Sequence, residues 1–134
     1  MVSLQARRLK FLSTLPSRHA FDTMSRPGRP PDIEADIRFL STDEGGRSGP
    51  ALSGYRPTHD FGVEGMLNDA HHEYIGVDSV SPGATTRAQL WLLAPEYQAG
   101  RLYPGFAFTV QEGLHIVAHG EVVYVLNATL RATV

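Results

Sequence analysis

The chain has 134 residues, of which 42% are hydrophobic and 19% are charged, and it contains no cysteine. This length and composition predict one globular domain that buries its own core. The lack of cysteine excludes disulfide bridges, thiolate zinc sites, iron–sulfur clusters and cysteine nucleophiles, and it favours a cytoplasmic location. No apolar run reaches the roughly 20 residues that a membrane-spanning helix requires, so we expect no membrane partner.

Charge divides the chain at the Pro-rich stretch 26–31. Residues 1–31 carry six basic side chains and one acidic one, a net charge of +5, whereas residues 32–134 carry six arginines and thirteen acidic side chains, a net charge of −7. We expect residues 1–31 to form a basic N-terminal extension, either flexible or docked on the body, and residues 32–134 to form the domain. The alternatives for the extension are an RNA-contacting arm, a surface anchor, or an addition upstream of a true start at Met24. An acidic body is a poor general ligand for nucleic acid.

Alternation of apolar and polar residues predicts strands along residues 32–134. Ile33–Phe39 alternates with a period of two, which is typical of a half-buried strand. Ser41–Gly54 is rich in Gly, Ser, Asp and Pro and predicts a long loop, after which Tyr55–Val63 is extended again. After a polar connection at Asn68-Asp69, the remaining strands are expected at His72–Val77, Thr86–Leu93, Phe106–Gln111 and His115–Leu126.

Turn residues separate the later strands. Ser81–Gly83 and Glu112–Gly113 are typical of tight turns, and the alternation slips near His119–Glu121, where we expect a β-bulge. Six short strands without a convincing helix indicate an all-β protein. We expect a six-stranded antiparallel closed barrel, because closure removes the exposed edges of a small sheet.

Several motifs of this domain occur in a familiar order. Ile33–Arg47 is a strand followed by Asp-Glu-Gly-Gly-Arg, Gly54–Pro57 reads Gly-Tyr-Arg-Pro, and Gly105–Gly113 is a strand that ends in Gln-Glu-Gly. Over residues 33–127 the chain resembles the third, C-terminal β-barrel domain of translation elongation factor Tu. The resemblance implies a six-stranded antiparallel barrel standing as a domain of its own, with a role related to translation.

The resemblance does not extend to GTP hydrolysis. A phosphate-binding loop requires glycine-rich backbone followed by a lysine that reaches the phosphates. The single lysine, Lys10, stands in the setting Arg-Arg-Leu-Lys-Phe, which is not such a loop. We therefore expect no nucleotide and no other cofactor.

The resemblance also implies candidate binding residues. In the elongation factor, the regions that match Arg47, Arg56, Thr58 and His115 contribute contacts to the T stem of tRNA. Thr58 stands where that family has a glutamine, His115 stands where it has an arginine, and Ser48-Gly49 replaces its His-Thr. These changes remove hydrogen-bond donors, and each lost phosphate contact weakens RNA binding.

The two candidate arginines also have a structural interpretation. Arg47 and Arg56 lie beside glycine and proline on loops, where binding residues concentrate. A long loop also requires internal hydrogen-bond partners. The alternative is that these arginines hold their loop by donating to backbone carbonyls or to Asp43 and Glu44.

Trp91 is the single tryptophan of the chain. Strand parity places it on the outer face, beside Arg87 and Gln89. An outward tryptophan indicates a partner surface or a covering segment. We expect either a protein partner, which includes a second copy of the chain, or cover by apolar residues of the extension, namely Leu9, Phe11 and Leu12.

Histidines raise the question of a metal site. His71 and His72 are adjacent and therefore point to opposite faces of a strand, so one of them at most joins Glu73 in a site. His59, Asp60, His115 and His119 add candidates without the two-histidine helical spacing of a zinc protease. We expect no metal. No serine lies in a Gly-flanked nucleophile elbow, and we expect no enzymatic activity.

These observations favour a non-catalytic binding module that contacts a protein or a second copy of itself through its outer face. The alternative is an RNA-binding module that uses Arg47, Arg56 and the basic extension on a tRNA-like stem. A small hydrolase or metal-dependent enzyme is the third hypothesis, because catalytic groups far apart in sequence can meet in space.

Overall fold

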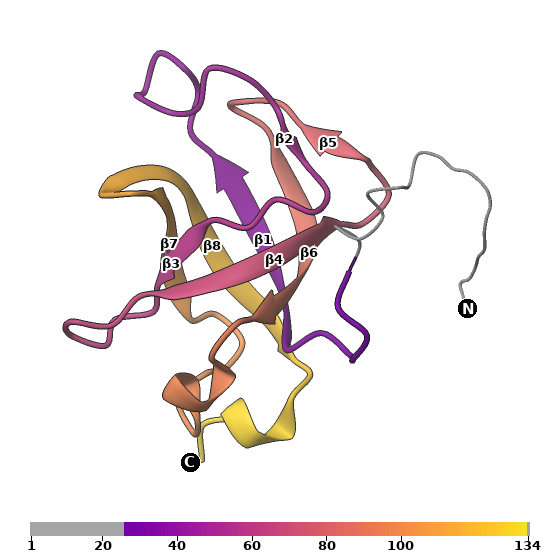
Figure 1. Cartoon of the computed structure of the whole chain (residues 1–134), viewed down its shortest axis with the longest axis vertical. Coiled ribbons are helices and arrows are strands. Elements are labelled where there is room, and N and C mark those ends of the chain that lie inside the picture. The colour runs from indigo at the N-terminus through magenta and orange to yellow at the C-terminus, as the bar shows by residue number, and fades with distance from the viewer. Residues whose placement is uncertain (1–25, 134) are drawn as a thin grey trace.

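The computed structural model describes residues 26–133. Six strands close into an antiparallel barrel in the order β1-β6-β4-β3-β7-β8, and a two-stranded sheet, β2-β5, lies beside it (Figure 1). The predicted all-β barrel is therefore confirmed. The barrel strands are β1 (Ile33–Phe39), β3 (Thr58–Asp60), β4 (Asn68–Tyr74), β6 (Thr85–Leu92), β7 (Ala107–Glu112) and β8 (His115–Val125), and the small sheet is β2 (Ala51–Leu52) with β5 (Ser79–Val80).

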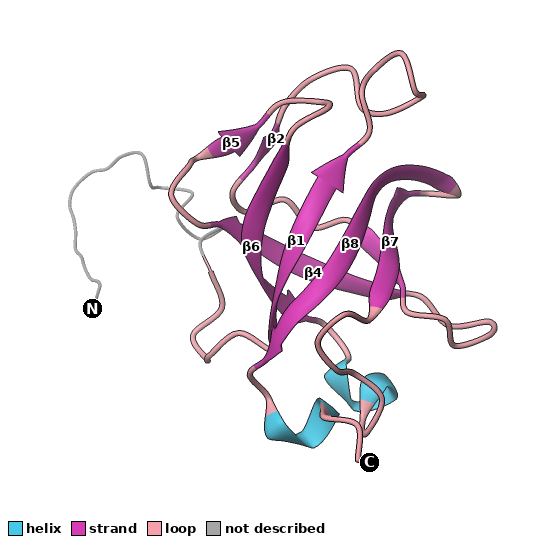
Figure 2. Ribbon diagram, turned by 180° about the vertical axis from the view of Figure 1, so that it is seen from behind, coloured by secondary structure: helices cyan, strands magenta, loops and turns pink. Residues whose placement is uncertain are grey.

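Two short 3₁₀ helices lie at one end of the barrel, η2 (Pro95–Gln98) and η3 (Ala128–Leu130) (Figure 2). The segment that follows η2 is joined to the end of η3 by the backbone hydrogen bond from the Leu102 amide to the Leu130 carbonyl, at 2.8 Å. Both leucines are fully buried, so these segments close that end of the core. Within residues 26–133, no helix has the length and apolar character needed to cross a membrane.

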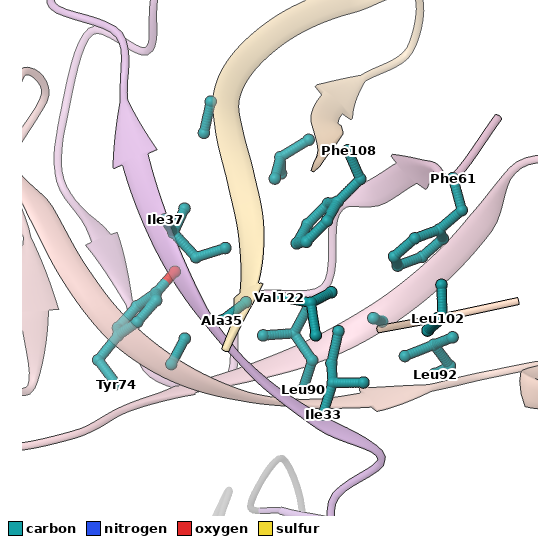
Figure 3. Packing of buried hydrophobic residues seen from close by; sticks show 14 of the residues in the cluster. Ile33, Ala35, Ile37, Phe61, Tyr74, Leu90, Leu92, Leu102, Phe108 and Val122 are labelled. Atoms are coloured by element: carbon teal, nitrogen blue, oxygen red, sulfur yellow. The ribbon is translucent and has the colours of Figure 1, made fainter. Parts of the chain in front are cut away.

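Alternate residues of the strands fill the barrel. On β1 the predicted inward set is buried, because Ile33, Ala35, Ile37 and Phe39 are at most 1% exposed. Figure 3 shows Ile33, Leu90 and Val122 from three neighbouring strands pointing toward one another. Burial of such aliphatic side chains is the main stabilising contribution to a small domain.

Strand β4 begins earlier than the alternation predicts. The polar connection expected at Asn68-Asp69 is the start of this strand, which ends at Tyr74 and not at Val77. Asn68 is buried, and its side-chain amide donates to the Ala94 carbonyl at 3.0 Å and accepts from the Ala94 amide at 3.1 Å. The Asn68 side chain therefore pairs with both backbone groups of Ala94, just after β6, as a neighbouring strand would. Similarly, the predicted loop 41–54 contains the short strand β2.

The predicted bulge on β8 is wrong in its position. His119–Glu121 pairs with β1 without a break. The register instead skips Val117 in the pairing with β7 and Val123 in the pairing with β1. Two extra residues, one on each side of the regular stretch, explain the slip in alternation.

The Pro-rich segment lies against the barrel. Arg29 donates to the Asp32 carboxylate at 3.1 Å and to the Leu92 carbonyl at 2.7 Å. Asp32 is 1% exposed, and it also accepts from the Leu92 amide and from the Asn127 side chain. The backbone amides of Leu126 and Asn127 donate to the Asp32 carbonyl. Asp32 thus joins the start of β1, the end of β6 and the segment after β8.

Candidate functional site

The loop between β1 and β2 holds Arg47 through internal contacts. Its guanidinium donates to the carbonyls of Gly49 at 3.2 Å and Pro50 at 3.1 Å, and it forms an ion pair with Glu112. The same guanidinium lies over the Tyr55 ring, 4.8 Å from its centre. The prediction of backbone carbonyl partners for Arg47 is therefore confirmed.

The carboxylate partner of Arg47 differs from the expected one. It is Glu112 at the end of β7 and neither Asp43 nor Glu44, and Glu44 pairs instead with Arg38 at 3.5 Å. The reason is geometric, because closure of the barrel brings the β7–β8 hairpin next to the loop. Sequence proximity therefore pointed to the wrong acids.

Hydrogen bonding within this cluster shifts the acidity of its members. The Tyr55 hydroxyl donates to Glu112 at 2.5 Å. Partial burial acts to raise the pKa of Glu112, but the hydrogen bonds from Tyr55 and Arg47 outweigh it and hold that pKa below its usual value. Burial, together with the bond to Glu112, raises the pKa of Tyr55. The cluster thus consists of a charged pair capped by a neutral phenol.

His115 belongs to the same end of the barrel as Arg47. Its Nε2 atom donates to the Gly45 carbonyl and so links the β7–β8 hairpin to the loop that carries Arg47. The structure therefore brings these two predicted residues together. Both side chains donate hydrogen bonds to backbone carbonyls of the loop between β1 and β2.

Trp91 lies on the outer face of the barrel, as predicted, yet it is only 3% exposed. Its indole Nε1 donates to the Arg29 carbonyl at 2.5 Å, and the Arg26 guanidinium lies 5.8 Å from the ring centre. The Pro-rich segment thus covers Trp91. Neither the expected partner surface nor the expected apolar residues of the extension included this segment. The apolar residues proposed earlier as cover, Leu9, Phe11 and Leu12, lie outside the described residues.

A hollow of about 330 Å³ lies next to Trp91, between the Pro-rich segment and strands β4 and β6. Arg56 lines it, and the Arg56 Nε donates to His71 Nδ1 at 3.3 Å. The His71 ring meets the Trp91 ring edge to face, with centres 5.6 Å apart. Thr58 lies near this group, since its hydroxyl donates to Asp69 of the lining at 2.8 Å. The structure therefore brings Arg56 and Trp91 together in this hollow, here called the Trp91 hollow, and Thr58 lies beside it.

A second hollow, of about 400 Å³, opens where the β6–β7 connection passes the end of β8. Tyr103 and Tyr124 line it and are 51% and 56% exposed. Pro104 and Leu126 extend the apolar lining, and Arg131 is also part of it. We call this surface the Tyr103–Tyr124 hollow. The alternation placed Tyr124 within a strand, but nothing in the sequence indicated that the two tyrosines meet.

A buried polar chain crosses the inside of the barrel. His59 and His72 are fully buried, and their Nε2 atoms lie 2.8 Å apart. His59 Nδ1 lies 3.0 Å from the Asn68 carbonyl, which only accepts, so Nδ1 carries the proton and Nε2 accepts from His72. His72 Nδ1 then accepts from the Tyr74 hydroxyl at 3.1 Å. Every member is satisfied when both histidines are neutral.

Burial determines the acidity of this chain. It lowers the pKa of His59 to about 4, and it lowers that of His72 well below the usual value, to which the neighbouring histidines add. His71 points outward, and its Nε2 atom lies 2.6 Å from Glu73 Oε2. This confirms that the two adjacent histidines face opposite sides of the strand. Among residues 26–133, no three histidine, aspartate or glutamate side chains are placed to hold a metal ion.

Sequence reasoning missed the contribution of the Pro-rich segment to the Trp91 hollow. Pro27 and Arg29 line it, yet they precede the first strand and share no motif with Arg56. The signal available in the sequence was the cluster of basic and proline residues before β1. Comparison with known families adds no further identification, because no family model matches the chain.

Proposed function

We propose that the protein is a non-catalytic protein-binding module on a barrel related to the third domain of elongation factor Tu. The observation that carries this proposal is the Tyr103–Tyr124 hollow, an apolar depression with two half-exposed tyrosines at its rim. Exposed aromatic side chains gathered around a depression are typical of protein interfaces.

The relation to the elongation factor is supported by where the shared motifs lie. The Gly-Gly-Arg motif ends at Arg47 in the loop after β1, Tyr55-Arg56-Pro57 leads into β3, and Glu112-Gly113 forms the turn between β7 and β8. The three motifs are distant in sequence, and each supplies one member of the cluster formed by Arg47, Tyr55 and Glu112. A motif set that builds one cluster is consistent with common descent.

The composition of the Tyr103–Tyr124 hollow suits a protein partner. Tyrosine provides a large contact area at a low entropic cost, and tyrosine and arginine are enriched among the residues that dominate the binding energy of measured interfaces. The Tyr103 ring packs edge to face against Phe106, with ring centres 5.3 Å apart. This packing reduces the freedom that the side chain would lose on binding.

The contacts of Arg47 argue against the RNA-binding alternative. Its guanidinium already donates to two carbonyls and to Glu112. A phosphate would have to displace these partners, next to a carboxylate that repels it. Arg56 is the exposed arginine left for RNA among the predicted pair, and one phosphate contact gives weak affinity.

The experiment compares the double variant Tyr103→Ala/Tyr124→Ala with the control Tyr97→Ala. Tyr97 is also half-exposed but lies on η2, outside the lining. Self-association is measured by sedimentation, and heterologous partners by cross-linked affinity capture from the native cells. We expect the double variant to weaken the partner contact at least tenfold, since buried interface tyrosines contribute about 1–2 kcal/mol each.

The control should retain the contact, and all three proteins should unfold at similar urea concentrations because the exchanged side chains are exposed. Equal binding by the double variant and the wild type would contradict the proposal. Recovery of RNA alone, in a salt-dependent manner, would favour the RNA-binding alternative.

A further inference from the structure

We infer that the Trp91 hollow binds an acidic side chain of a partner protein together with a neighbouring apolar residue of the same segment. This inference rests on the proposed protein-binding function and assigns it a second contact with a defined chemistry. The carrying observation is an arginine at the edge of an apolar depression whose terminal nitrogens have no acceptor among residues 26–133.

Arg56 is oriented by the residues behind it. Its Nε donates to His71 Nδ1, and His71 in turn donates from Nε2 to Glu73 at 2.6 Å. No residue from 26 to 133 accepts a hydrogen bond from the two terminal nitrogens of Arg56. A guanidinium held in this way offers a pair of parallel donors, which match the two oxygens of a carboxylate.

The floor of the hollow is apolar. Trp91, Leu92 and Pro27 line it, and the indole nitrogen is already bonded to the Arg29 carbonyl. Leu93 stands at the rim and is 78% exposed. An apolar side chain next to the bound carboxylate would cover Leu93 and remove its surface from water.

The charges around the hollow complement one carboxylate rather than a chain of phosphates. Arg26 pairs with Glu73 at 3.9 Å and Arg29 pairs with Asp32 at 3.1 Å. Of the three arginines here, Arg56 is therefore the one without a carboxylate partner among residues 26–133. Asp69 lines the hollow as well, so its carboxylate disfavours a run of phosphates more than a single carboxylate held on Arg56, and it can accept a peptide N–H. A peptide supplies one carboxylate with an N–H close by, whereas an RNA backbone presents a phosphate at every nucleotide beside its 2′-hydroxyl.

The test begins with selection from a random peptide library against the full chain. Enriched peptides are then titrated while the fluorescence of Trp91 is followed, which reports the hollow directly because the chain has one tryptophan. We expect aspartate or glutamate beside a leucine or aromatic residue in the enriched set. A peptide with glutamine in place of the acid should bind about tenfold more weakly or worse.

Two charge-matched variants separate a local contact from general attraction. Arg56→Gln removes the proposed donor pair, whereas Arg38→Gln removes the same charge from an exposed arginine at the other end of β1. We expect Arg56→Gln to weaken peptide binding about tenfold or more, and Arg38→Gln to leave it within twofold. Equal loss in both variants would overturn the inference.

The absence of any enriched acidic peptide would also overturn it, as would stronger binding of an RNA hairpin at the same site. Failure here is distinguishable from failure of the proposed function. The Tyr103→Ala/Tyr124→Ala experiment measures partner binding at the other hollow, and it can succeed while the Trp91 hollow binds no peptide.

Discussion

Gly45 and Gly46 lie side by side in the loop that carries Arg47, yet each requires glycine for a different reason. Gly45 has a φ of +95°, which other residues rarely adopt, but open space surrounds the position of a Cβ atom. Gly46 has no such backbone angle, but a Cβ there would lie 2.3 Å from the Leu40 carbonyl oxygen. The first glycine is required by conformation and the second by close backbone approach.

This difference predicts the effects of alanine at the two positions. Gly45→Ala should lower the free energy of unfolding by about 1 kcal/mol through backbone strain. Gly46→Ala should lower it by about 2–3 kcal/mol or more, because backbone atoms cannot yield as a side chain does. The measurement is urea unfolding followed by circular dichroism.

Gly49→Ala is the control for this loop, since it has neither a positive φ nor an atom within 4 Å of the added Cβ. It should change the unfolding free energy by less than about 0.5 kcal/mol. A Gly46→Ala variant as stable as Gly49→Ala would show that the loop and Leu40 separate easily.

At the scale of elements, the packing between β7 and β8 includes one cross-strand pair in which a glycine faces an aromatic ring. Phe108 faces Gly120, and a Cβ on Gly120 would lie 2.3 Å from the phenylalanine ring. The ring is buried and also packs on Phe61, with centres 4.8 Å apart. The missing side chain of Gly120 thus provides the space for an aromatic ring of the core.

We predict that Gly120→Ala destabilises the barrel by about 2 kcal/mol through this overlap. The same substitution in a Phe108→Leu background should cost less, because the smaller side chain leaves room for the methyl group. A double-mutant cycle of unfolding free energies measures the difference, which should reach about 1 kcal/mol. Strictly additive effects would mean that the ring moves aside without cost.

The alternation of residues predicted most strands but not all of their limits. It worked for β1 and β6, where the inner face is aliphatic. It failed at the start of β4, because the buried Asn68 is satisfied by Ala94, and a hydropathy pattern does not record such a bond. On β8, two extra residues produced one apparent slip, and the pattern alone could not place them.

At the scale of the whole molecule, the core contains a polar chain that is matched to neutral histidines. A proton added to His59 would place two N–H groups face to face between His59 and His72. The pKa of His59 is about 4 in the folded protein, and that of His72 is also lowered, against about 6.5 in an unfolded chain. Unfolding therefore takes up protons below pH 6.5, and stability must decrease as the pH falls through this range.

We predict that the free energy of unfolding decreases between pH 6.5 and pH 5 by roughly 1–2 kcal/mol through His59, and that His72 lowers it further in the same direction. Glu44 and Glu112 have lowered pKa values, so their contribution to stability is lost only below about pH 4.5. The measurement is urea unfolding at a series of pH values in one buffer of constant ionic strength.

Replacement of both buried histidines by phenylalanine should remove most of this dependence, because it removes the two groups that take up protons on unfolding. Exchange of the exposed His119 for glutamine should retain it. A wild-type protein equally stable at pH 5 and pH 6.5 would contradict the protonation argument.

The candidate site was predictable only in part. Resemblance to a family selected Arg47, Arg56, Thr58 and His115, and strand parity placed Trp91 on the outer face. The division of these residues into two groups follows from barrel closure, which no local pattern encodes. Cover of Trp91 by the Pro-rich segment likewise depends on the contact of Arg29 with Leu92, far away in the sequence.

The contacts of Asp32 have an architectural consequence. They hold Asp32, which precedes β1, next to Asn127, which follows β8. The two ends of the barrel segment therefore lie close together. A segment with adjacent ends can be spliced into a surface loop of a host protein without stretching that host. The same fold can thus serve alone or as a cassette carried within a larger polypeptide.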